Sequence, residues 1–187
     1  EVILRELLFD RGDHLDLGLI EESERNLRRY FFLGSVKIEV SKDGTSADVR
    51  VVVQDLYSRA LSPLISGEAD EISYGGGALD YNFLGRGQEI ELTAEHDAII
   101  GNRGEVFYRI PRLNGSRHIL STTVGITEEG HTALASLSHP FYALRTRWAY
   151  GVRIFSEELS QRLYSKRVLT TRYADRTSGG ELWITRS

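Results

Sequence analysis

The hydrophobic pattern predicts one amphipathic helix near the start of the chain. Over residues 15–31 the apolar positions recur at close to 3.6 residues and form one broad stripe. Asp16 precedes most of the stripe and carries a side chain suited to capping a helix N-terminus. Glu24 lies four residues before Arg28, which is the favourable order for an ion pair along a helix. We interpret this charged face as solvated, with a docking face as the alternative.

The pattern then changes to the period of two that is typical of β-strands. Apolar and polar residues alternate over residues 36–40 and, with one interruption, over residues 49–53. Lys42, Asp43 and Gly44 lie between these two runs, and Asp-Gly is a frequent turn dipeptide in hairpins. Residues 36–53 are therefore predicted to form an antiparallel hairpin.

Helical periodicity is lost after about residue 60, and we predict about eight short strands between residues 61 and 187. Turn residues separate the alternating runs at positions 82–87, 113–116 and 128–130, and Pro140 marks a further corner. No helix is predicted between these strands. The fold class is therefore mainly β, with a small α+β part at the N-terminus and an antiparallel meander that forms either a sandwich or an up-and-down barrel.

The polarity of the two strand faces allows both architectures. One face of the predicted strands is charged, and we place four of its residues in the lumen of the barrel alternative: Glu91, Arg109, Arg147 and Arg153. The other face is apolar, and in that alternative it meets lipid through Leu120, Val124, Trp148, Tyr150 and Val152. A membrane barrel directs its apolar face into lipid, whereas a soluble sandwich buries that face in a dry interior. Periodicity does not decide between them.

Composition narrows the function classes. The 187 residues carry a net charge of −4, which argues against nucleic acid as a partner. The absence of Cys excludes disulfides, thiolate zinc sites and cysteine nucleophiles from this sequence. Arginine greatly outnumbers lysine, which we interpret as codon bias, with arginine–carboxylate pairing in a polar interior as the alternative. No apolar run has the length of a membrane-spanning helix.

No constellation of residues points to catalysis. The five histidines are not spaced as metal ligands on one element, and no Gly-x-Ser-x-Gly elbow is present. The glycine run at residues 75–77 lacks the strand-to-helix context of a phosphate loop, and we interpret it as a flexible or closely packed strand. We therefore predict no catalytic residue, no metal and no cofactor. An enzyme carried on a barrel is the weakest of the alternatives.

Several short segments, in their order and spacing, resemble one bacterial family. Three segments resemble the second half of a POTRA (polypeptide-transport-associated) domain, and a fourth resembles its last strand: residues 9–13, 19–28, 34–40 and 49–55. Three later segments match turns of the barrel that follows such domains: residues 82–87, 111–118 and 140–149. Nearly the whole chain is thus similar to the BamA/TamA-like bacterial surface-antigen family.

The resemblance implies a domain division and a function. Residues 1–57 would be the C-terminal part of a POTRA domain in the periplasm, and residues 58–187 the first half of an outer-membrane β-barrel. The first POTRA strand and the later barrel strands are not found in the sequence, so we expect a fragment. The implied function is non-enzymatic assembly or translocation of proteins or lipids, with outer-membrane lipid, unfolded clients and periplasmic accessory proteins as partners. A periplasmic small barrel or sandwich that binds a lipid or peptide is the alternative.

Two surfaces would act on clients in this family. The POTRA sheet has an edge to which an extended client can add as a strand, here Ser35, Val36, Lys37, Ile38, Glu39 and Val40. The first barrel strand forms part of a seam that can open sideways, here with the candidate residues Leu61, Ser62, Pro63 and Gly67. Proline lacks the ladder donor and glycine loosens a strand, so pairing at the seam should be weak.

Overall fold

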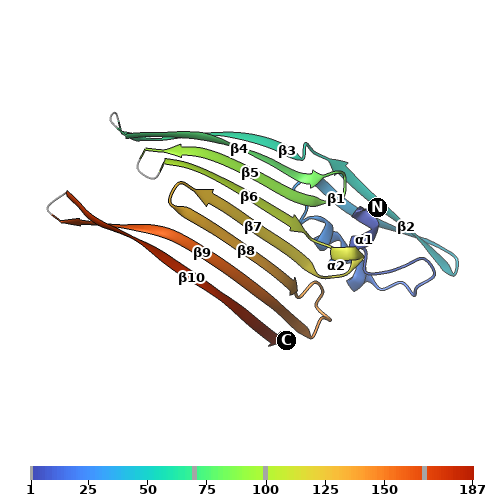
Figure 1. Cartoon of the computed structure of the whole chain (residues 1–187). Coiled ribbons are helices and arrows are strands. Elements are labelled where there is room, and N and C mark those ends of the chain that lie inside the picture. Colours follow the sequence, from blue (N-terminus) through green and yellow to red (C-terminus); the bar gives the residue numbers. More distant parts are fainter. Residues whose placement is uncertain (1, 69–70, 99–100, 166–167) are drawn as a thin grey trace.

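The computed structural model describes residues 2–68, 71–98, 101–165 and 168–187, which form two helices, a hairpin and one large sheet (Figure 1). The N-terminal elements are α1 (Val2–Glu6), α2 (Leu17–Leu27), β1 (Leu33–Asp43) and β2 (Ser46–Asp55). The strands of the large sheet begin with β3 (Arg59–Glu68), β4 (Glu71–Phe83), β5 (Gln88–Asp97) and β6 (Gly101–Ile110). After the 3-10 turn η1 (Leu113–Gly115) they continue with β7 (Ile119–Thr127), β8 (Gly130–His139), β9 (Trp148–Ser165) and β10 (Val168–Arg186).

The predicted helix is shorter than its apolar pattern suggests. It begins after Asp16, whose side chain accepts hydrogen bonds from the Gly18 and Leu19 amides at 2.9 and 3.3 Å, as the capping prediction requires. It ends at Leu27, because the following residues turn toward β1. Among the described residues, no helix has the length and apolar character needed to cross a membrane.

The hydrophobic core lies between α2 and the β1–β2 hairpin. Leu27, Phe32, Leu33 and Val36 are buried together, and partly buried side chains from α1, β2 and β4 pack against them. The hairpin prediction is confirmed, since β1 and β2 pair antiparallel on either side of the turn at residues 44–45. The N-terminal part therefore has a packed interior of its own.

The eight predicted strands are confirmed as one antiparallel sheet in which each strand pairs with its neighbours along the chain, in the order β10-β9-β8-β7-β6-β5-β4-β3. The sheet is curved but not closed, because β3 and β10 are its two edges and do not pair with each other within the described ranges (Figure 1). The meander is thus part of an up-and-down architecture rather than two packed sheets.

The register separates the two faces of the sheet. Leu137, Val152 and Leu182 lie opposite one another across β8, β9 and β10, and such cross-strand partners share a face. The same face carries Val106 and Val124 on β6 and β7. The opposite face carries the charged and small residues of the alternating pattern. The sheet is therefore amphipathic across its whole width.

Candidate functional site: the junction and the two faces of the sheet

The N-terminal part lies at one end of the large sheet, against three turns (Figure 1). These turns join β4 to β5, β6 to β7 and β8 to β9. In the first, Gly87 has a φ of +66°, and a Cβ atom there would lie 2.9 Å from Val2 Cγ1, so a larger residue would strain the turn and force Val2 to shift. The second and third turns carry arginines that pair with carboxylates of the N-terminal part. We call this contact region the junction.

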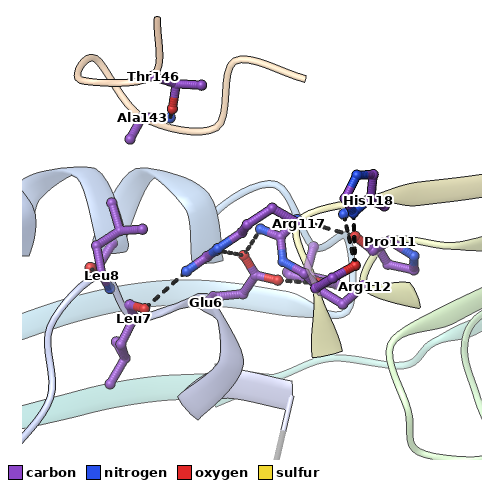
Figure 2. Close-up of polar contacts among 12 residues, drawn as sticks. Glu6, Leu7, Leu8, Pro111, Arg112, Arg117, His118, Ala143 and Thr146 are labelled. Carbon is purple, nitrogen blue, oxygen red and sulfur yellow. Dashed lines mark hydrogen bonds and ion pairs between the residues drawn. The ribbon is translucent and has the colours of Figure 1, made fainter. Parts of the chain in front are cut away.

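Glu6 is the centre of the junction. It is the last residue of α1, and only 1% of its surface is exposed. The side chains of Arg112 and Arg117 converge on its carboxylate (Figure 2). Arg112 and Arg117 both approach Oε2, and Arg117 Nη1 lies 3.4 Å from it. The Tyr30 hydroxyl donates to Oε1 at 2.7 Å. The buried charge is thus paired and hydrogen-bonded, which is the condition for burying a carboxylate.

Backbone carbonyls on both sides of the junction hold the two arginines in place. Arg112 Nη1 donates to the Pro111 carbonyl at 3.1 Å, and Arg117 Nη2 reaches across the junction to the Leu7 carbonyl at 3.1 Å. The Arg117 guanidinium also lies over the Tyr142 ring, 5.0 Å from its centroid. Two segments more than 100 residues apart in the chain are therefore joined by several charge-assisted contacts.

The electrostatics of the cluster fix its charge state. Burial and the negative charge of Glu6 raise the pKa of the Tyr30 hydroxyl well above its ordinary value, so it remains a donor. Burial and the neighbouring Arg112 lower the pKa of Arg117, while Glu6 opposes that change. A guanidinium nevertheless stays charged in proteins. Glu6, Tyr30, Arg112 and Arg117 thus form a fixed cluster of paired charges, which we call the Glu6 clamp.

A second pair of contacts lies at the other side of the junction. Arg145 Nη2 donates to Asp16 Oδ2 at 2.6 Å, and the Leu144 amide donates to Glu22 Oε1 at 3.1 Å. Glu22 is buried on α2, whereas Arg145 is exposed. The β8–β9 turn is therefore fixed to both the cap and the body of α2.

The structure places all five predicted lipid-facing residues on the apolar face of the sheet. Leu120 and Val124 lie on β7, and Trp148, Tyr150 and Val152 lie on β9. Leu120 and Val152 both lie opposite Leu137 of β8, so the two sets point to the same side of the sheet. This face is not buried: 52% of Val124, 47% of Trp148 and 42% of Tyr150 is exposed. A dry interior, which a soluble sandwich requires, does not form over these residues. Contact with lipid stays a prediction.

Three of the four predicted lumen-facing residues share the opposite face. Glu91, Arg109 and Arg153 lie on β5, β6 and β9 at positions whose cross-strand partners also point to the polar side. Arg109 lies 3.6 Å from Glu89, an arginine–carboxylate pair within this polar surface. Arg147 precedes β9 and has no strand register. The Arg109–Glu89 pair is an instance of the arginine–carboxylate pairing that we gave as the alternative reason for the arginine content.

The residues predicted as the client edge lie on β1, and their outer edge is partly covered. Among the described strands β1 pairs only with β2, so its outer edge has no strand partner. The Ile38 amide points away from β2 and donates to Glu24 Oε2 at 3.1 Å. Alternate residues of a strand direct their backbone N–H and C=O groups to the same side, so the backbone groups of Val36 and Val40 also point to this outer edge. The Ile38 amide is therefore already bonded within the chain, and binding of a client at this edge stays a prediction.

The seam residues lie on β3, which is an edge of the large sheet. Its register with β4 is continuous from Arg59 to Glu68 and includes Pro63, which lies opposite Gly76. Gly67 has a φ of +115°, and a Cβ there would lie 1.9 Å from the Glu71 carbonyl oxygen. No break in pairing marks the seam, and its weakness stays a prediction.

Sequence reasoning missed the junction. The turn containing Arg112 and Arg117 was identified only as a turn, and Glu6 lies in a short helix without a distinctive pattern. Pairing over such a separation leaves no periodic signal. The one available signal was the density of arginine in segments expected to be turns. Within the described residues, no group of three or more His, Cys, Asp or Glu side chains is placed to hold a metal ion.

Comparison with known proteins supports the architecture. No protein-family model and no curated protein matches the chain. Among solved structures, it is similar to the crystal structure of BamA from Haemophilus ducreyi lacking POTRA domains 1–3, with a TM-score of 0.57 and 14% sequence identity. The match covers 97% of this chain and 40% of that chain. The likeness shows a BamA-like β-barrel fold, present here as an open sheet.

Proposed function

We propose that this chain is part of an outer-membrane machine that inserts or translocates proteins or lipids without covalent chemistry. The observation that carries the proposal is the amphipathic sheet, whose apolar face stays open over eight strands. In this proposal residues 58–187 form one side of a barrel wall and residues 1–57 lie in the periplasm as part of a POTRA-type domain. The fold similarity to BamA supports the same conclusion.

The exposed apolar area supports a lipid environment. Ile126, Ile154 and Leu182 on the apolar face are 64%, 57% and 83% exposed, in addition to the residues already described. Soluble monomers rarely leave such a wide contiguous apolar surface in water. In a bilayer the same surface is favourable, and the charged face lines a lumen.

The two open edges of the sheet support a larger barrel. Lipid cannot satisfy unpaired backbone groups, so β3 and β10 require strand partners in a membrane. These partners would come from further chain or from a second copy. The structure matched in the comparison is longer than this chain, which favours further chain.

The junction supports a fixed orientation. The three turns that contact the N-terminal part lie at one end of the sheet, so this end would face the periplasm if residues 1–57 lie there. Trp148 and Tyr150 lie at this end of β9, as aromatic residues of an interfacial girdle do. Arg186 lies over the Trp148 ring at 5.4 Å. The Glu6 clamp would thus hold the periplasmic part beneath the barrel wall.

Clients would bind through backbone hydrogen bonds. An extended client strand can add to the outer edge of β1 once Glu24 releases the Ile38 amide. The β3 edge would supply the second surface, where a client strand or a closing barrel strand pairs. Outer-membrane lipid, unfolded clients and periplasmic accessory proteins are the proposed partners.

Membrane fractionation tests the proposal. The protein expressed from its own gene is extracted with carbonate and then run on a denaturing gel with and without boiling. We expect it to stay with the membranes and to migrate differently after boiling, because a closed barrel resists detergent. Release by carbonate without a gel shift would indicate a soluble β-domain that binds a lipid or peptide.

Hydrogen exchange tests the seam separately. If β3 opens sideways, amides of residues 59–68 should exchange faster than those of β6 and β7 in the same protein. Equal protection of β3 and the central strands would contradict a seam at Leu61, Ser62, Pro63 and Gly67, while leaving the membrane assignment intact.

A further inference from the structure

The apolar face of the sheet carries a groove of about 490 Å³ across β8, β9 and β10. The lining residues that point to this face are Leu137, Tyr150, Val152, Leu182 and Ile184, and His118 joins them at the start of β7, on the side of the junction. This volume is within the range of small-molecule sites in proteins. The groove is therefore large enough to hold part of a hydrocarbon chain.

A cluster of histidine and tyrosine side chains bounds the groove at its junction end. His118 Nε2 and the Tyr150 hydroxyl lie 3.0 Å apart, and the His139 ring stacks on the Tyr150 ring with the centroids 5.1 Å apart. The Ser116 hydroxyl donates to the Leu113 carbonyl at 2.7 Å and lies 3.1 Å from His118 Nδ1, so the His118 ring is held at both nitrogens. The contact between His118 and Tyr150 is exposed. The Tyr150 hydroxyl is thus held in a fixed position that a ligand can reach.

The charge at this end of the apolar face is positive. Arg186 of β10 lies opposite Trp148, and its guanidinium is 5.4 Å from the centroid of that ring. Within the described parts of β7 to β10, the one carboxylate at an apolar-face position is that of Glu158, which lies at the other end and pairs with Arg176 at 3.0 Å. An anion near Arg186 would therefore meet a guanidinium and no competing carboxylate on this face.

We propose that the groove binds a phospholipid whose headgroup has a net negative charge. One acyl chain lies along Leu137, Val152 and Leu182, and the phosphate lies between Tyr150 and Arg186. These two residues are on adjacent strands, about 5 Å apart in the hydrogen-bonding direction, so a phosphate can accept from both. The cationic group of a zwitterionic headgroup would be repelled by Arg186. The site rests on the proposed membrane function, in which this face meets lipid.

Native mass spectrometry tests the proposal on the protein expressed from its own gene and purified in detergent. Phosphatidylglycerol and phosphatidylcholine with identical acyl chains are titrated separately, and the fraction of protein that retains a lipid gives an apparent Kd. Arg186→Gln removes the charge, and Tyr150→Phe removes the hydroxyl alone. Arg176→Gln, at the other end of the same face of β10, and Tyr108→Phe, on the same face of β6 but outside the groove, are the matched controls.

We expect one retained phosphatidylglycerol, favoured about fivefold over phosphatidylcholine, which is the factor that one arginine supplies near an anionic headgroup. Arg186→Gln should abolish this preference. Tyr150→Phe should weaken the binding of both lipids about threefold, as expected for one lost hydrogen bond, and both controls should behave as the wild type. The gel shift on boiling verifies that each variant is folded. Equal retention of both lipids by the wild type, or the same loss in Arg176→Gln as in Arg186→Gln, would overturn the proposal.

The phospholipid site and the membrane function fail in different experiments. Release by carbonate without a gel shift would contradict the membrane function. A protein that stays with the membranes and shifts on boiling, but retains both lipids equally, would contradict the phospholipid site alone.

Discussion

Removal of the Glu6 charge should loosen the junction. In Glu6→Gln the amide oxygen can still accept from Tyr30, but the charge opposite Arg112 and Arg117 is lost. The Arg112 and Arg117 side chains are only 11% and 21% exposed, so water replaces the carboxylate poorly. The variant therefore isolates the ion pairs from the tyrosine hydrogen bond.

The expected magnitude follows from burial. Breaking a buried ion pair by removing one partner costs about 3–5 kcal/mol, because the remaining charge is left without compensation. Arg112 and Arg117 retain the Pro111 and Leu7 carbonyls, which places the expected loss near the lower end, at about 3 kcal/mol. Since each 1.4 kcal/mol is roughly a factor of ten, local opening of the junction should increase about 100-fold.

Amide hydrogen exchange measures this opening directly. Amides of α2 and the start of β1 should exchange about 100-fold faster in Glu6→Gln, while those of β6 to β8 keep their protection. Glu39→Gln removes the carboxylate of an exposed pair with Lys37 and should change nothing measurable. Combining Glu6→Gln with Arg112→Gln should recover part of the loss, because one unpaired charge is then removed. Equal exchange in Glu6→Gln and Glu39→Gln would refute the reasoning.

Three further predictions concern the cap, the apolar face and the glycine run. The Arg145 hydrogen bond and the backbone amides of α2 lower the pKa of Asp16 below its ordinary value of 3.8. The ionised Asp16 carboxylate therefore stabilises the fold above pH 3.8, and this contribution is lost as the pH falls through the lowered pKa. Carbon-13 NMR should show the pKa of Asp16 rising in Arg145→Gln. Val124→Arg should destabilise the membrane-inserted barrel by about 2–4 kcal/mol in a urea titration in vesicles, whereas Thr123→Arg on the opposite face should have little effect. Gly75→Ala should destabilise the barrel by about 1–3 kcal/mol in the same titration, because its Cβ would lie 2.3 Å from a carbonyl oxygen of β5; full stability would contradict the close packing of β4.

Local chemistry made much of the fold predictable. The cap at Asp16, the hairpin turn after Asp43 and the eight alternating strands all depend on neighbouring residues, whose preferences are readable from the sequence. The end of the helix was predicted too late, because Tyr30 and Phe31 continue the apolar period. In the structure they lie beyond the helix and still pack, Phe31 against Tyr81 and Tyr30 beside the core. Tertiary packing, not helical periodicity, places these two side chains.

The site was predictable only in part. The two faces of the sheet follow from alternation, which is why the apolar and charged sets separate correctly. The Glu6 clamp and the cap of Glu24 on the Ile38 amide arise from segments brought together by folding. No sequence pattern encodes such pairs. In the sequence alone, Glu6 and Glu24 cannot be distinguished from ordinary surface carboxylates.

The central claim, that the apolar face meets lipid, is tested most directly by a nitroxide scan of β7. Single cysteines at residues 120–126 of the protein expressed from its own gene are labelled in bilayers, and collisions with oxygen and with a water-soluble nickel complex are compared. The account predicts a period of two, with oxygen favoured at 120, 122, 124 and 126 and the nickel complex favoured at 121, 123 and 125. Access of the nickel complex to both sets, or to the even set alone, would contradict the membrane assignment.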